Sequence, residues 1–363
     1  MKHIFNIITV ITVLFVTSCV KEGDYSTEYN PDFKTNYEAF WNFVNENYCF
    51  LGDNYGYCKM VGGEKLDWNK VKEEMMPKVE AAATEEELFD IMGKSIDYLQ
   101  DGHVWIDSKF NHRGCFTFYN IAFPNEETYP KNFISGLITN QNSKILDYVY
   151  RTRNGHRYGT ITRGDKKFFY LHHSDFTKDL NKEDLEMFKP HLEKADGFIY
   201  DIRTNPGGSA QLSFNIAGRF VKNKTLVGYQ VIKDGKGHND VTEPSAIYIV
   251  PSKDGYNWAD MKTVVLTNRD VYSTANMFAS YMKEMPNVTV IGGITGGGGG
   301  DPSSYYLPNG WTVTLSSQKM VLDVDKVHIE PGVQPDIEVN ISKEDSDKKI
   351  DTILERAIVE LSK

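Results

Sequence analysis

The stretch TVVLTNRDVYSTANMFASYM, residues 263–282, leaves one short apolar segment, turns, and enters a second apolar segment. The first segment has the length and the flanking turn residues of a buried strand, whereas Phe278, Tyr281 and Met282 fall on one face of a helix. Ser273 stands where the turn meets the helix. A serine there can cap the helix or present its hydroxyl at a tight turn, and its position alone does not choose between the two.

Two similar apolar segments lie on either side of this stretch. GFIYDI, residues 197–202, precedes it, and VTVIGG, residues 288–293, follows it. Between the first two strands, Leu212, Ile216 and Phe220 recur with the spacing of a helix. Because strands that alternate with helices usually pair in parallel, the sequence predicts an α/β core.

The segments on both sides of this core are predicted to be helical. Apolar residues recur near the 3.6-residue period over 33–43, and TEEE at Thr84 is typical of a helix start with acidic first-turn residues. We therefore expect an N-terminal helical domain over residues 31–100, an α/β core over 101–345, and a closing C-terminal helix over 346–363.

The N-terminus has the layout of a secretory signal. An apolar run over residues 4–16 ends in Val-Thr-Ser-Cys, which resembles a bacterial lipobox. We expect residues 1–18 to be a lipoprotein signal peptide, Cys19 to carry the lipid, and residues 19–30 to form a tether, which places the protein in the bacterial cell envelope. The alternative is a plain signal peptide with an incidental cysteine.

Charge and cysteine content exclude some classes of function. The net charge is −10, and Lys and Arg form no cluster, so we expect no nucleic-acid partner. In an oxidising compartment Cys49 and Cys58 could form a disulfide and leave Cys115 alone. The spacing of Cys and His suggests no zinc site, and we expect no metal.

Two further turns hold residues that could take part in catalysis. In DIRTNPGGS, residues 201–209, Gly207 and Gly208 can turn sharply and expose backbone N–H groups to an anion. Taken alone, Asn-Pro-Gly-Gly is only a turn signal. In LQDGHVWI, His103 lies before an apolar strand, where it could act as a base.

The candidate base has competitors. His172 and His173 are adjacent, and on a strand they would point to opposite faces, so at most one of them could help. With nine histidines in the chain, no single one stands out by itself.

The motifs taken together carry more weight. YLQDGHVWI, YDIRTNPGGSA, VLTNRDVYSTANMF and IEPGVQPDIEV, in that order, resemble the S41 family of serine peptidases, which includes the C-terminal processing proteases and the core domains of tricorn protease. The resemblance covers nearly the whole mature chain. It implies a ClpP/crotonase-like α/β core with a mixed sheet, with Ser273 as nucleophile and His103 as base. The N–H of Thr274 and one from Gly207 or Gly208 would form the oxyanion hole.

The resemblance also suggests how the serine is activated. Processing proteases use a lysine near a Thr-x-Gly-Lys stretch, whereas tricorn-like members use a histidine oriented by a glutamate. The corresponding stretch here, GGITGGGGGD at residues 292–301, has no lysine. The histidine arrangement is therefore favoured, with Glu330 of IEPGVQPDI orienting His103. We interpret the glycines at 296–300 as a flexible loop that lines the cleft.

These observations predict a lipid-anchored serine endopeptidase that acts outside the cytoplasm on peptides or unfolded proteins, without metal or organic cofactor. The interval from Phe110 to about Leu180 reads as hairpin-like strands, so we expect no complete PDZ domain. A binding protein on the same fold, like the retinoid-binding interphotoreceptor proteins, is one alternative. Another acyl-transfer activity, such as that of an esterase, is a second. The oligomeric state stays open.

Overall fold

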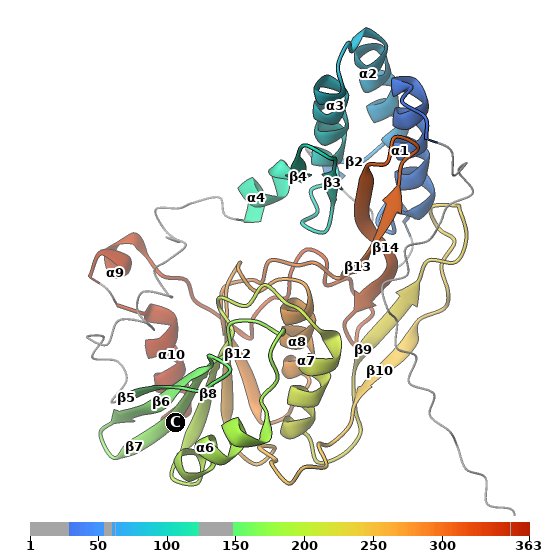
Figure 1. Cartoon of the computed structure of the whole chain (residues 1–363). Helices are drawn as coiled ribbons and strands as arrows, with labels where there is room; N and C mark the ends of the chain where they lie inside the picture. Colours follow the sequence, from blue (N-terminus) through green and yellow to red (C-terminus); the bar gives the residue numbers. More distant parts are fainter. Residues whose placement is uncertain (1–28, 54–59, 62, 123–147, 349) are drawn as a thin grey trace, which may run out of the picture.

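The computed structural model describes residues 29–53, 60–61, 63–122, 148–348 and 350–363. Its main sheet has the strand order β15-β12-β11-β8-β7-β6-β5, and Figure 1 shows the strands from β5 to β8 side by side. These strands are β5 (Tyr148–Arg151), β6 (Arg157–Arg163), β7 (Lys166–His172), β8 (Gly197–Asp201), β11 (Thr263–Thr267), β12 (Val288–Gly292) and β15 (Ile337–Glu338). Neighbours from β15 to β7 pair in parallel, whereas β5, β6 and β7 pair antiparallel. The predicted α/β fold with a mixed sheet is confirmed.

Helices cover both faces of the main sheet. They are α6 (Lys182–Leu192), α7 (Ala210–Ala217), α8 (Thr274–Lys283) and α10 (Thr352–Leu361). Phe198 and Tyr200 of β8 pack in one hydrophobic cluster with α6, α7 and α8, whereas Ile199 packs in another with α10. This alternation follows from the two-residue period of a strand. Because both faces are buried, the parallel strands are continuous apolar runs in the sequence.

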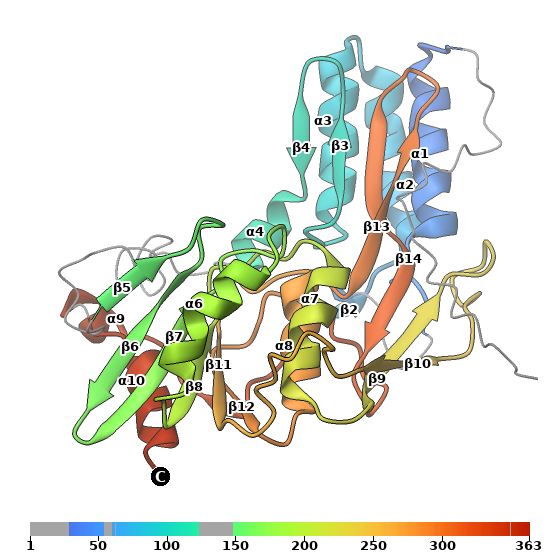
Figure 2. The same ribbon diagram turned by 60° about the horizontal axis from the view of Figure 1, so that its bottom comes forward.

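A second sheet connects this core to the N-terminal helices over residues 33–97, which we call the helical lobe. Its order is β10-β9-β14-β3-β4, with β13 paired to β14. Its strands are β3 (Trp105–Asp107), β4 (His112–Gly114), β9 (Thr225–Ile232), β10 (Ser245–Ile249), β13 (Gly300–Tyr306) and β14 (Thr312–Leu322). In Figure 2, β13 and β14 run up beside α1 (Phe33–Asn47), α2 (Trp68–Ala81) and α3 (Glu85–Asp97). The lobe and these strands share one core, which includes Leu88, Ile106 and Leu315.

The remaining short elements are β1 (Met60–Val61), β2 (Glu64–Lys65), α4 (Phe116–Ala122), η2 (Gly218–Phe220) and α9 (Lys343–Asp347). Local sequence signals account for several helix ends. Thr84 begins α3 with a capping box, in which its hydroxyl accepts the N–H of Glu87 and the Glu87 carboxylate accepts its N–H. The predicted helix start is confirmed. The expected closing helix is present as α10, which buries Ile353, Leu354 and Ile358, whereas Ile350 lies before the helix and is 41% exposed.

The hairpin predicted before residue 180 is also present. β6 and β7 pair antiparallel along their whole length, and β7 continues the main sheet by pairing with β8. These strands therefore belong to the α/β core. Residues 123–147 of the same interval lie outside the described residues, so the expectation about a PDZ domain stays a prediction.

Other predictions concern residues outside the described ranges. The signal peptide over 1–18, Cys19 and Cys58 all lie there, so lipidation and the disulfide between Cys49 and Cys58 stay predictions. Cys115 is buried. Within the described ranges, no helix has the length and apolar character needed to cross a membrane. No group of three or more His, Cys, Asp or Glu side chains there could hold a metal ion.

The parallel strands determine where a site can form. β8, β11 and β12 are neighbours that point the same way, so their carboxyl ends lie at one edge of the sheet. The segments that follow them are 202–209, 268–273 and 293–299. These segments hold the predicted serine, the Asn-Pro-Gly-Gly turn and most of the glycine run, so the fold brings the predicted motifs to one place.

Candidate active site

Ser273 occupies a strained turn between β11 and α8. Its φ and ψ are 56° and −126°, an uncommon conformation for a residue with a side chain. Its N–H donates to the carbonyl of Gly297 at 2.9 Å. The hydroxyl makes no capping hydrogen bond to α8, so the interpretation of this serine as a helix cap does not apply. Such strain costs about 1–3 kcal/mol and recurs at functional turns that present a side chain.

The hydroxyl instead meets an imidazole from a distant part of the chain. His103 Nε2 lies 2.9 Å from Ser273 Oγ, although 170 positions separate the two residues. The backbone N–H of His103 donates to the Asp101 carboxylate at 2.8 Å, and its ring packs on Tyr272 with 4.9 Å between centroids. With its proton on Nδ1, the ring can accept the serine proton at Nε2. The structure thus brings the predicted nucleophile and base together.

Asp101 is a buried carboxylate at the centre of this arrangement. Besides the His103 N–H, it accepts the hydroxyls of Ser316 at 2.9 Å, Tyr48 at 3.1 Å and Tyr272 at 3.4 Å. These donors compensate a charge that would be costly to bury unpaired. The sequence alone could not show this role of Asp101, because its other partners are Tyr48 after the end of α1, Ser316 of β14 and Tyr272 of the serine turn.

Burial lowers the pKa of His103 below its usual value near 6.5. The carboxylates of Asp101 and Asp301 and the carbonyl of Gly300 oppose this effect without cancelling it. The imidazole is therefore neutral at neutral pH, which is the state that can accept a proton. Once it is protonated, the two carboxylates favour the imidazolium.

Glu330 makes no hydrogen bond to the imidazole in the described part of the chain. Nδ1 of His103 is buried and has no hydrogen-bond partner within the described residues. The Glu330 carboxylate accepts the N–H of Gly299 at 2.6 Å. The hydrogen bond from His103 to Glu330 that the resemblance implied is therefore not formed, and the role of Glu330 stays a prediction; its carboxylate lies against the glycine run, residues 296–300.

This glycine run packs closely beside the serine turn. All five of its residues are buried. A Cβ on Gly297 would lie 2.0 Å from the carbonyl oxygen of Glu330, and the φ of Gly297 is +90°. A Cβ on Gly298 would lie 3.0 Å from the nitrogen of Ser273. The interpretation of the run as a flexible loop is therefore wrong, since glycine is needed where backbones approach this closely.

The Asn-Pro-Gly-Gly segment also lies against the serine turn, and we call residues 204–208 the NPGG loop. A Cβ on Gly207 would lie 2.9 Å from the Thr274 nitrogen, and the Thr274 hydroxyl donates to the Gly208 carbonyl at 2.7 Å. The N–H of Gly207 already donates to Asn205 Oδ1 at 2.9 Å, which removes it from the predicted oxyanion hole. In the described part of the chain, the N–H groups of Gly208 and Thr274 have no acceptor and could bind an oxyanion.

Comparisons with known proteins point to a peptidase family. Residues 167–339 match the model of peptidase family S41, and residues 29–96 match that of the tricorn protease C1 domain. A carboxyl-terminal-processing protease of Synechocystis sp. (strain ATCC 27184 / PCC 6803 / Kazusa) is 28% identical over 167 residues. The carboxy-terminal processing protease CtpA of Bacillus subtilis (strain 168) is 28% identical over 160 residues.

These two matches cover 45% and 41% of this chain, and the chain spans only 36% and 30% of the relatives. The match to one solved structure covers much more of this chain. A candidate peptidase from Parabacteroides merdae ATCC 43184 is 36% identical, with a TM-score of 0.77 over 92% of this chain and 97% of that one. The chain belongs to peptidase family S41. Its relatives there are serine-type hydrolases.

The two competing histidines of this S41 chain have other partners. His172 Nε2 lies 2.7 Å from the Thr204 hydroxyl, and His173 Nδ1 lies 2.6 Å from the Tyr200 hydroxyl. Burial lowers their pKa values to about 4 and about 3, so both are neutral at neutral pH. No hydrogen bond joins either to Ser273 in the part of the chain that is described. His172 supports the NPGG loop, a role that needed the folded structure to be recognised.

Proposed function

We propose that this protein is a serine endopeptidase that hydrolyses peptides or unfolded proteins, with Ser273 as nucleophile and His103 as general base. The observation that carries the proposal is the 2.9 Å contact between His103 Nε2 and the hydroxyl of a serine held at a strained turn. A protein that only binds a ligand has no need for this pairing. The curated relatives, both named as processing proteases, support peptide substrates.

In the first half of the reaction, His103 Nε2 takes the hydroxyl proton as the oxygen of Ser273 attacks the substrate carbonyl carbon. The carbonyl oxygen then becomes an oxyanion. The N–H groups of Gly208 and Thr274 donate to it, and Thr274 begins α8, whose N-terminus carries partial positive charge. Ser273 and Thr274, which are adjacent on one turn, therefore supply the nucleophile and one of the two oxyanion donors.

The proton then moves on to the leaving group. The imidazolium of His103 donates it to the amine as the peptide C–N bond breaks, which leaves an acyl group on Ser273. Water attacks this ester, His103 accepts a proton from the water, and the serine oxygen recovers it when the ester breaks. Asp101 and Asp301 stabilise the imidazolium in both halves.

Glu330 completes the proposed Ser-His-Glu site through the backbone. By accepting the N–H of Gly299, it fixes the glycine run. That run supplies the Gly297 carbonyl to the N–H of Ser273 and the Gly300 carbonyl near the His103 ring. One carboxylate thereby positions both catalytic residues.

Hydrolysis of an unfolded protein such as casein by the purified protein tests the proposal. Wild type should cleave it, and Ser273→Ala and His103→Ala should each lower kcat by at least about 10³-fold. Ser342→Ala, which removes a helix-capping serine far from the turn, should leave kcat unchanged. Cleavage by folded Ser273→Ala at the wild-type rate would contradict the assignment. A folded wild type that cleaves neither peptides nor esters would favour a binding protein.

We also propose that the enzyme is anchored outside the cytoplasm through a lipid on Cys19. The support is the apolar run over 4–16 followed by Val-Thr-Ser-Cys. Replacing Cys19 with Ala should move the protein from the membrane fraction to the soluble fraction, whereas Cys58→Ser should not. Membrane association that survives in Cys19→Ala would overturn the lipid anchor and leave the peptidase proposal untouched.

A further inference from the structure

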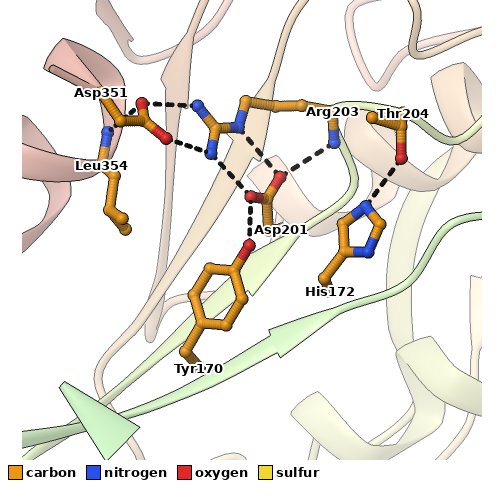
Figure 3. A network of polar contacts seen from close by, with 7 residues as sticks. All are labelled: Tyr170, His172, Asp201, Arg203, Thr204, Asp351 and Leu354. Atoms are coloured by element: carbon orange, nitrogen blue, oxygen red, sulfur yellow. Dashed lines mark hydrogen bonds and ion pairs between the residues drawn. The ribbon is translucent and has the colours of Figure 1, made fainter. Parts of the chain in front are cut away.

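A buried ion-pair network joins the C-terminal helix to the strand that leads into the NPGG loop (Figure 3). Arg203 Nη2 lies 2.7 Å from Asp201 Oδ2, and its Nη1 and Nη2 each lie 2.7 Å from one carboxylate oxygen of Asp351. The Tyr170 hydroxyl donates to Asp201 at 2.7 Å. Arg203, Asp201 and Asp351 are at most 3% exposed. Charged side chains that are buried this completely destabilise the fold unless they are paired and hydrogen-bonded.

Asp351 comes from a different part of the chain, 148 positions beyond Arg203. It is the N-cap of α10, where its Oδ1 accepts the N–H of Leu354 at 3.0 Å. The helix behind it is fixed, because its apolar face packs in one cluster with Ile199 and Leu266 of the main sheet. The Asp351 carboxylate is therefore held by a rigid helix, and both of its oxygens accept hydrogen bonds from the guanidinium in a bidentate ion pair.

Arg203 directly precedes the NPGG loop. Its backbone N–H donates to Asp201 Oδ1 at 3.1 Å, so its main chain and its guanidinium are both fixed. Thr204, the next residue, is held by His172. Gly208, whose N–H is aimed at the oxyanion in the proposed mechanism, lies only five positions beyond Arg203. The direction in which the loop leaves β8 thus depends on the network.

We propose that Asp351 is a positioning residue for the oxyanion-binding N–H of Gly208, acting through Arg203. The inference rests on the proposed peptidase function. Oxyanion donors work over a narrow range of distances, about 2.7–3.1 Å, so a small shift of the loop weakens them in the transition state more than it weakens substrate binding. The C-terminal helix is then part of the catalytic apparatus, although α10 contributes no residue to the site.

The test compares two variants that each deprive a buried arginine of a carboxylate in the full chain. Asp351→Asn keeps the helix cap, because asparagine caps as well as aspartate, and removes the charge opposite Arg203. Asp254→Asn does the same to Arg219, which is 4% exposed and lies beyond α7, away from the serine turn. Melting temperature, kcat and KM for casein-derived peptides are measured for both, beside wild type and Ser273→Ala.

Asp351→Asn should lower kcat by about 10- to 100-fold with KM within about twofold of wild type, measured well below its melting temperature. Asp254→Asn should lose less thermal stability, because the Asp254 side chain is 40% exposed, and it should keep kcat. A kcat for Asp351→Asn equal to that of wild type, or a loss no larger than that of Asp254→Asn, would overturn the inference. Inactive wild type would instead count against the peptidase itself.

If Asp351→Asn does not fold, Asp351→Glu provides the comparison, since it keeps the charge and displaces the carboxylate by one methylene. Its kcat should fall while KM holds, because the guanidinium must follow the displaced carboxylate. An unchanged kcat in this variant would also overturn the positioning role.

Discussion

The two glycine-containing segments that flank Ser273 are held in place in different ways. The NPGG loop is fixed by side chains: the amide of Asn205 accepts the N–H of Gly207 and donates to the His173 carbonyl at 3.1 Å. The glycine run has no side chains and is fixed by close backbone packing and by one carboxylate, that of Glu330. One segment carries the Gly208 N–H that the proposed mechanism uses as an oxyanion donor, and the other supplies the carbonyl that accepts the N–H of Ser273.

This difference predicts that the two segments respond differently to substitution. In the NPGG loop, each supporting side chain can be shortened and the loop can relax by a small amount. In the glycine run, a Cβ on Gly296 or Gly297 would lie 2.4 or 2.0 Å from a backbone carbonyl oxygen that cannot move aside, and a Cβ on Gly298, Gly299 or Gly300 would lie within 3.0 Å of a buried neighbour. We therefore expect substitutions in the glycine run to cause large losses of stability and activity, and substitutions around the NPGG loop to cause partial losses.

The largest effect is expected for Gly297→Ala. Its Cβ would lie 2.0 Å from the Glu330 carbonyl oxygen at a φ of +90°, so the variant should lose about 3 kcal/mol or more of unfolding free energy and nearly all activity. Gly310→Ala is the matched control, because Gly310 has a φ of +81° with no atom within 4 Å. It should lose only about 1–2 kcal/mol, the cost of the backbone conformation. Equal losses in urea unfolding would show that packing of the run is unimportant.

A partial loss of stability and activity is expected for Asn205→Ala. The variant leaves the N–H of Gly207 and the carbonyl of His173 without a partner, which should cost about 2–3 kcal/mol and lower kcat about tenfold with little change in KM. Asn287→Ala serves as the control, since Asn287 donates to the carbonyls of Trp258 and Met261 away from the serine turn. Its stability should fall while kcat holds. If both variants kept full kcat, the NPGG loop would not position the oxyanion donor.

A pH-dependent loss of stability is expected from His172, on the side of the NPGG loop. His172, which supports Thr204, has its pKa lowered to about 4 by burial. Between pH 6.5 and 4 the unfolded chain therefore binds a proton that the folded chain does not, so the unfolding free energy falls as pH falls, by roughly 3 kcal/mol for this group. His172→Gln should flatten the decline measured by urea unfolding at pH 7, 5.5 and 4.5. An unchanged decline would exclude His172 as its source.

The smallest effect is expected for Glu330→Gln. Glutamine keeps an oxygen that can accept the N–H of Gly299, so kcat should stay within about fivefold of wild type, whereas Glu330→Ala should lose more. A loss of about 10⁴-fold in the glutamine variant would instead mean that the charge acts on the imidazole directly, as an orienting carboxylate does.

Much of the fold followed from local patterns, and much of the site did not. The strands β8, β11 and β12 were visible as apolar runs, and the motif around Ser273 identified the turn, because both depend on neighbours in sequence. The partners of Glu330 and the packing of the glycine run depend on segments brought together only by the fold. Five consecutive glycines suggest backbone flexibility when only the sequence is considered, whereas in the folded protein they allow backbones to pack closely together.

The network of Arg203 illustrates the same limit. Asp201 lies two residues from Arg203, so that ion pair could have been suspected from the sequence. Asp351 is 148 positions away in a segment that the sequence marked only as a helix with one apolar face. Only the packing of α10 on the main sheet shows that its N-cap meets the guanidinium.

The central claim, that His103 activates Ser273 for attack, is tested most directly by reacting the folded protein with a fluorophosphonate probe and mapping the modified peptide by mass spectrometry. Wild type should be labelled on Ser273 alone, and the labelling rate should rise with pH through a pKa below the usual histidine value, because burial lowers the pKa of His103. His103→Ala should react far more slowly. Labelling at another serine, or at Ser273 with equal speed in His103→Ala, would contradict the account.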